Sequence, residues 1–173
     1  LSPEVPAAQA AYVRRYTEFF PPGALRGLRL LAYQHSAVGR DLLVEILEQL
    51  GARVIPAGRS ETFVPIDTEN IGTEQLETIQ ALVDQAGAVD AVVSTDGDSD
   101  RPLLLGVERG RVRFFGGDLV GMGAAEFLGA DAVVVPITCN DAVDRGRLRA
   151  VVEPKTRIGS PYVIAGMERA RAR

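Results

Sequence analysis

The chain has 173 residues, of which 46% are hydrophobic and 24% are charged, so it can bury the core of one globular domain or somewhat more. Its net charge of −4 gives no general attraction to nucleic acid, and no apolar run approaches the ~20 residues that cross a bilayer. We therefore predict no nucleic-acid partner and no membrane partner. The single cysteine, Cys139, lies among apolar residues, which indicates a buried, inert thiol in a reducing, cytoplasmic setting.

Helix and strand patterns alternate over the first half of the chain. Apolar residues recur at helical spacing in three stretches, and short apolar runs between them indicate buried strands. Ser36 and Thr73 stand where helix caps are expected. A strand, a helix and a second strand in this order indicate a parallel β-α-β unit. The patterns predict a helix over residues 2–20, a strand over 28–33, a helix over 36–50, a strand over 53–56, a surface loop over 58–72, a helix over 73–86 and a strand over 90–95.

The second half of the chain begins with two short strand patterns around Arg109 and Gly110, which predict a hairpin. The strand and helix patterns then start again, with Asp118 where the cap of a helix is expected. The predicted elements are strands over residues 103–107 and 111–115, a helix over 118–128, a strand over 132–136 and a helix over 167–173.

The renewed pattern predicts a domain boundary near Phe115. We expect an α/β fold in residues 1–114, with a mixed, mainly parallel sheet and flanking helices. Residues 115–173 are short for an independent α/β domain and predict a partial second α/β unit. The chain begins with Leu1 rather than Met, and its last helical pattern has no stop signal. We therefore expect an interior fragment of a longer protein.

The richest chemistry lies in the sequence Asp-Gly-Asp-Ser-Asp-Arg, which follows the strand predicted to end at Thr95. Carboxylates at alternate positions of a turning loop can converge, and at ~4–6 Å they raise one another's pKa unless a cation neutralises them. Hard divalent cations bind such oxygen ligands. The alternating carboxylates therefore predict a metal site rather than a solvated acidic turn, with the ligands Asp96, Asp98 and Asp100.

Magnesium fits this loop better than calcium. A calcium loop that started at Asp96 would need glycine at its sixth position and glutamate at its twelfth, which are Arg101 and Val107 here. Magnesium takes few carboxylates and leaves coordination positions for water or phosphate. Arg101 carries a planar fork of donors that can hold a phosphate beside the ion, although an ion pair with a neighbouring aspartate is the simpler alternative.

The loop resembles the Asp-Gly-Asp-Gly/Ala-Asp-Arg magnesium loop of the α-D-phosphohexomutases, the phosphoglucomutase/phosphomannomutase family. Short segments around the loop resemble the family too, from Gly27-Leu28-Arg29 to Leu128-Gly129-Ala130. The resemblance covers nearly the whole chain. It implies that residues 1–114 correspond to the family's second domain and residues 115–173 to the start of its third.

The resemblance also implies a reaction. In this family a phosphoserine exchanges its phosphoryl group with a hexose phosphate, and Mg²⁺ bridges the aspartates and that phosphate. Arg101 is then a catalytic residue, and Gly159 and Ser160 are neighbours of the substrate. The chain lacks a recognisable phosphoserine loop and a Gly-Glu-x-Ser-Gly sugar loop. We therefore expect it to be inactive without the missing flanking domains, and the identity of the hexose stays open.

Two other functions fit the residues. One is a non-catalytic module that binds a cation or a sugar phosphate. The other is a haloacid-dehalogenase-like phosphatase, in which Asp96 would accept the phosphoryl group, although its Asp-x-Asp pair usually follows the first strand. The only histidine, His35, follows the first strand within a turn of small residues, and a turn or capping role is the simplest expectation for it.

Overall fold

The structure is a computed structural model that describes residues 5–146 and 148–172. The chain forms two compact units, Leu1–Phe115 and Gly116–Arg173, which are described separately below. The helix-start signal at Ser2 lies outside the described residues. None of the helices within those residues is both long enough and apolar enough to cross a membrane.

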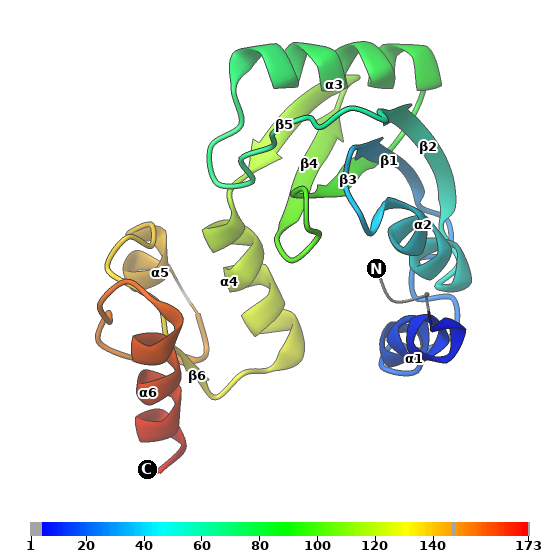
Figure 1. Ribbon diagram of the computed structural model, residues 1–173. Coiled ribbons are helices and arrows are strands. Elements are labelled where there is room, and N and C mark those ends of the chain that lie inside the picture. The colour runs from blue at the N-terminus through cyan, green and yellow to red at the C-terminus, as the bar shows by residue number, and fades with distance from the viewer. Residues whose placement is uncertain (1–4, 147, 173) are drawn as a thin grey trace. The chain divides into compact units, whose positions relative to one another are not determined.

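The first unit contains a five-stranded sheet in the order β2-β1-β3-β4-β5 (Figure 1). Strand β1 pairs in parallel with both β2 and β3, and β4 pairs antiparallel with both β3 and β5. All strands except β4 therefore run in one direction, which confirms the predicted mixed, mainly parallel sheet. The strands are β1 (Arg29–His35), β2 (Arg53–Arg59), β3 (Ala91–Thr95), β4 (Pro102–Glu108) and β5 (Arg111–Phe115).

Helix α3 (Thr73–Ala86) covers one face of this sheet and buries Ile79 completely (Figure 1). Side chains alternate between the two faces of a strand, so residues that pair across several strands form a row on one face. Burial of such large apolar side chains contributes about 1.5–3 kcal/mol each to folding. The row beneath α3 runs across all five strands and consists of Ile55, Leu31, Val92, Leu105 and Phe114.

The opposite face of the sheet is covered by α2 (Arg40–Gln49), on which α1 (Pro6–Thr17) packs in turn. A small apolar cluster centred on the buried Val13, Ile46 and Leu50 joins the two helices. The first unit therefore has the layered α/β architecture that the alternating sequence patterns predict, and α2 connects the parallel strands β1 and β2.

The predicted helix caps are wrong in detail. Helix α2 starts after Gly39 instead of Ser36, and the Ser36 hydroxyl oxygen accepts a 2.8 Å hydrogen bond from the backbone N–H of Val64. Similarly, Thr73 is the first residue of α3 and Gly72 is its cap. In contrast, the hairpin turn is confirmed, because Arg109 and Gly110 both have positive φ (52° and 77°), as this two-residue turn requires.

Within the described residues, the second unit contains three helices and a short two-stranded parallel sheet. Its β6 is shorter than predicted, since only a single bridge between Pro136 and Thr156 continues the pairing and Pro136 has no N–H to donate. Asp118 does not cap α4, because its carboxylate accepts from the Asn140 N–H. The elements are α4 (Gly117–Leu128), β6 (Ala132–Val133), α5 (Ala142–Arg145), β7 (Val151–Val152) and α6 (Ser160–Arg171).

Cys139 lies in this second unit and is buried, as the sequence predicts. Burial and a hydrogen bond with Asp118 raise the pKa of its thiol to about 11. Since the thiolate is the reactive form, this cysteine is inert at neutral pH.

Candidate metal site

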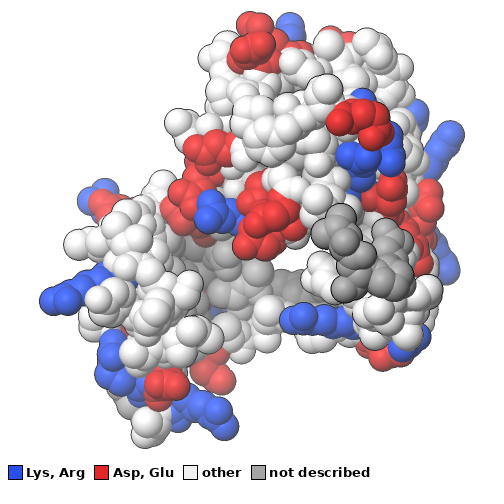
Figure 2. Space-filling view, viewed as in Figure 1, with Lys and Arg blue, Asp and Glu red and all other residues white. Residues whose placement is uncertain are grey.

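The residues from Asp96 to Arg101 form the loop between β3 and β4, called the aspartate loop below. It starts where β3 ends, at the sheet edge where the parallel strands β1 and β2 also end. Ligand sites of open α/β sheets favour this edge. Figure 2 shows acidic side chains and a neighbouring basic one gathered where Figure 1 places this loop.

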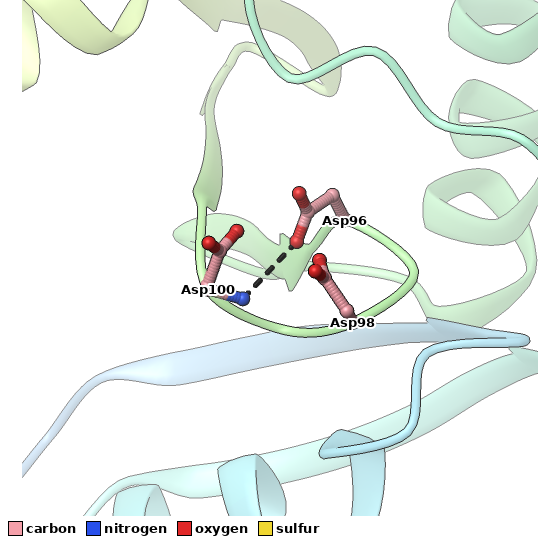
Figure 3. Close-up of side chains that lie close together, drawn as sticks. All are labelled: Asp96, Asp98 and Asp100. Carbon is pink, nitrogen blue, oxygen red and sulfur yellow. Dashed lines mark hydrogen bonds between the residues drawn. The ribbon is translucent and has the colours of Figure 1, made fainter. Parts of the chain in front are cut away.

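Asp96 shapes the loop from within. Its half-buried carboxylate accepts hydrogen bonds from the backbone N–H groups of Asp100 and Arg101, both 3.2 Å long. Figure 3 shows the bond from Asp100. Burial by itself would raise the pKa of Asp96, but the donors from Arg101 and Asp100 outweigh it and hold the pKa below its ordinary value. Asp96 is therefore ionised and fixed before any cation arrives.

The three aspartates converge as the sequence predicts. One oxygen of each of Asp96, Asp98 and Asp100 lies within 4.8 Å of the others, and the side chains gather on the inner side of the loop (Figure 3). The charge of Asp98 is the main reason why the pKa of the exposed Asp100 carboxyl is raised. A cation bound between these carboxylates would remove that repulsion.

The donor set fits magnesium. All three groups offer hard oxygen atoms, and at the Mg²⁺–oxygen distance of about 2.0–2.1 Å the ligands of an octahedron stand roughly 3–4.2 Å apart. The observed limit of 4.8 Å is close to that range, and the exposed Asp98 and Asp100 can close the difference by rotating their side chains. Three protein ligands would leave the remaining positions for water or a phosphate oxygen.

Arg101 lies beside the triad with its side chain 62% exposed. Its Nε is 4.0 Å from the Asp96 carboxylate and 3.9 Å from that of Asp100, which is too long for a hydrogen bond. Exposed ion pairs of this kind contribute little energy. The ion pair with a neighbouring aspartate that the sequence offers as an alternative is therefore present, to both Asp96 and Asp100, but it is long and exposed and leaves the guanidinium able to donate to an anion.

Two residues near the triad hold unusual backbone conformations. Ser99, within the loop, has φ of +66°, a left-handed conformation that costs a non-glycine residue roughly 1–2 kcal/mol. His35, which ends β1, has φ of +28° and is completely buried. Strain of this kind persists only where surrounding contacts enforce it.

The buried His35 is tied to the start of the aspartate loop. Its Nε2 lies 2.9 Å from the backbone oxygen of Thr95, and because a carbonyl oxygen only accepts, Nε2 carries the proton. Its Nδ1 has no hydrogen-bond partner among the described residues. Burial lowers the pKa of the imidazole below its ordinary value of 6.5, which favours the neutral ring at neutral pH. The sequence predicts a turn role for His35 but not this contact with Thr95. The sequence signal that could have indicated the contact is the turn of small residues that follows a buried strand.

The structure brings four of the predicted site residues together, namely the three aspartates and Arg101, all in the first unit. The other two belong to the second unit. Gly159 precedes α6 with φ of +122°, and Ser160 is the first residue of that helix. Both are exposed.

Comparison with solved structures supports the fold. A crystal structure of a phosphoglucomutase/phosphomannomutase family protein from Burkholderia thailandensis superimposes with a TM-score of 0.72 over 93% of this chain and 35% of that protein. At 16% sequence identity, this similarity shows the fold alone.

Sequence comparison identifies the family. Residues 10–109 match the model of the phosphoglucomutase/phosphomannomutase α/β/α domain II. A phosphomannomutase of Sinorhizobium fredii is 44% identical over 94% of this chain, and one of Salmonella muenchen is 40% identical over 93%. The chain spans about a third (33%) of the length of both relatives. The chain belongs to the phosphoglucomutase/phosphomannomutase family.

Proposed function

We propose that this chain is the metal-binding part of a phosphohexomutase that moves a phosphoryl group between the 1- and 6-positions of mannose or glucose phosphate. The observation that carries the proposal is the convergence of Asp96, Asp98 and Asp100 within 4.8 Å at the carboxyl end of β3. The two phosphomannomutases that share 40% or more of its residues support it.

Within this proposal the three aspartates hold Mg²⁺. The ion, when bound, would stabilise the charge that builds up on the transferred phosphoryl group. Asp96 would hold its position without adjustment, because two backbone N–H groups already fix its carboxylate. Asp98 and Asp100 would move onto the ion from solvent.

Arg101 would hold the phosphate beside the ion. Its guanidinium is exposed and only distantly paired, so its N–H groups can donate to two phosphate oxygens without first breaking a strong ion pair. The exchanged phosphoryl group would reside on a serine outside this chain. The aspartate loop would therefore contribute charge and position instead of a nucleophile.

We assign residues 1–114 to the family's second domain and residues 115–173 to the start of the third. On this assignment Gly159 and Ser160 would lie near the sugar phosphate. The substrate would be a hexose phosphate, and the flanking domains of the same protein would be the partners that complete the active site. The setting would be the cytoplasm.

The direct test compares the 173-residue chain with the longer protein that its gene would encode. A coupled assay would use mannose 1-phosphate or glucose 1-phosphate with the matching sugar bisphosphate as primer. We expect no turnover from the chain alone, and Mg²⁺-dependent turnover from the longer protein. Asp98→Asn should slow the longer protein at least about 100-fold, because the metal supplies several kcal/mol of charge stabilisation.

A matched control is Glu77→Gln, which changes an exposed carboxylate on α3 and should leave the rate unchanged. Robust turnover by the chain alone would contradict the proposal, and so would full activity of the Asp98→Asn protein. The phosphatase alternative predicts phosphoryl transfer to Asp96 and a beryllium fluoride adduct there; no observation favours it, since β1 and β2 both precede β3.

A further inference from the structure

The aspartate loop is attached to a neighbouring turn that supplies no ligand. This turn follows β1 and leads into α2, and it lies about 60 positions from the loop in the sequence. Two hydrogen bonds join the turn to the loop, and a third joins the strand ends from which they start, all 2.9–3.0 Å long. They run from His35 Nε2 to the Thr95 oxygen, from the Val38 N–H to the Gly97 oxygen and from the Gly39 N–H to Ser99 Oγ.

Ser99 provides the only side chain of the loop in these three contacts. Its Oγ accepts the Gly39 N–H at 2.9 Å and also lies 3.0 Å from the Thr95 hydroxyl, which can donate to it. Ser99 stands between Asp98 and Asp100 in the chain. A shift of the Ser99 backbone would therefore move the backbones of both aspartates. The same residue is held in a left-handed conformation, which these two contacts stabilise.

Position 39 needs glycine because a side chain there would collide with Ser99, and not because of its backbone conformation. Its φ of −90° and ψ of 9° are open to other residues. A Cβ atom added there, however, would lie 2.9 Å from Ser99 Cβ, which is closer than real Cβ atoms approach, and 3.0 Å from Ser99 Oγ, which is a tight contact. Any larger residue at position 39 would therefore push Ser99, and with it the loop, out of place.

We infer that Ser99 and Gly39 are a positioning pair that presets Asp98 and Asp100 for the cation, without either residue contacting the cation itself. The inference rests on the proposed metal site, whose ligands it concerns. It deepens that proposal, because it says how the backbone between the two exposed carboxylates is held, so that only their side chains have to rotate onto the cation.

The test is a double-mutant cycle on the 173-residue chain with Gly39→Ala, Ser99→Gly and the two combined. Mn²⁺ serves as the probe, and electron paramagnetic resonance measures its free concentration. Gly39→Ala should weaken Mn²⁺ binding about tenfold while Ser99 is present, because overpacking displaces the loop. In the Ser99→Gly background the same change should matter less than about twofold, because the atoms that it would strike are gone.

Amide hydrogen exchange gives a readout that needs no metal. Ser99→Gly should speed exchange of the Gly39 N–H about tenfold, since that N–H loses its acceptor, and should leave the Val92 N–H in the core of the sheet unchanged. Thermal melting of every variant shows how far a loss of binding reflects unfolding.

The possible results separate this inference from the proposed function. Equal effects of Gly39→Ala in both backgrounds, or unaltered Mn²⁺ binding in all variants, would overturn the positioning pair alone. Binding that is absent in the unmodified chain, or that survives Asp98→Asn, would overturn the metal site and the pair's role together. Strong coupling between positions 39 and 99 in Mn²⁺ affinity, at similar melting temperatures, is the result that supports it.

Discussion

Asp96 and Asp98 are both proposed ligands, but they differ in what they do for the loop without a metal. Asp96 is half-buried and accepts two backbone N–H groups, whereas the Asp98 side chain is exposed. Hydrogen bonds to a charged group contribute about 1.5–3 kcal/mol each at best, and less where solvent reaches them. Aspartate thus stabilises the loop structure at position 96 but not at position 98.

Replacing Asp96 should therefore change the free energy of unfolding more than replacing Asp98. In the presence of EDTA, Asp96→Ala should lower the free energy of unfolding by about 1–3 kcal/mol, because two N–H groups lose their acceptor. Asp98→Ala should stay within about 0.5 kcal/mol of the unmodified chain, as expected for an exposed position. Urea unfolding of both variants measures this, and equal losses would show that Asp96 does not organise the loop.

His35 predicts a pH dependence of stability. Its pKa is lowered in the folded protein, so below the ordinary value of 6.5 the unfolded chain binds a proton that the folded chain does not. This contribution to stability is complete above pH 6.5 and is lost as the pH falls from there toward the folded pKa. The loss should not exceed about 1.4 kcal/mol per pH unit.

Urea unfolding at pH 7 and pH 5.5 tests this expectation, with His35→Gln as the matched variant. Glutamine can keep an N–H donor near the position of Nε2 but does not titrate. The variant should therefore lose less stability than the unmodified chain between the two pH values. Identical losses in both proteins would rule out His35 as the titrating group.

At the scale of elements, α3 anchors the side of the sheet that does not carry the α1–α2 pair. Ile79 is completely buried at its centre, so Ile79→Ala should lower the free energy of unfolding by about 2–5 kcal/mol. Glu77→Ala, an exposed position on the same helix, should change it by less than about 0.5 kcal/mol. Chemical denaturation compares the two, and similar effects would mean that α3 is not packed as described.

Most strands and the helices α2, α3 and α4 could be predicted from sequence, because hydrophobic periodicity follows from burial. The predictions were wrong at two boundaries: β2 continues to Arg59 instead of ending at residue 56, and α6 begins at Ser160 instead of residue 167. The run that became β3, the apolar face of α3 and the Arg109-Gly110 turn all carry that local signal. Helix caps were predicted less well. Ser36 and Asp118 have the right chemistry for capping, but each accepts a hydrogen bond from a residue distant in the chain instead, and such partners leave no local pattern.

At the scale of the whole molecule, the site too has parts that the local sequence predicts and parts that depend on residues distant in the chain. Asp96, Asp98, Asp100 and Arg101 are adjacent in sequence, so their convergence could be expected before the fold was known. The contribution of Gly39 could not, because its contact with Ser99 depends on β1 and β3 being neighbours in the sheet. Gly159 and Ser160 belong to another unit, and their part in the site stays a prediction.

The central claim is that the aspartate loop is a divalent-cation site. The most direct measurement is anomalous diffraction from crystals of this chain soaked in Mn²⁺, a redox-stable substitute for Mg²⁺. We predict one strong peak at about 2.0–2.3 Å from a carboxylate oxygen of Asp96, Asp98 and Asp100. A well-ordered loop without a peak, or a peak held by other residues, would contradict the account.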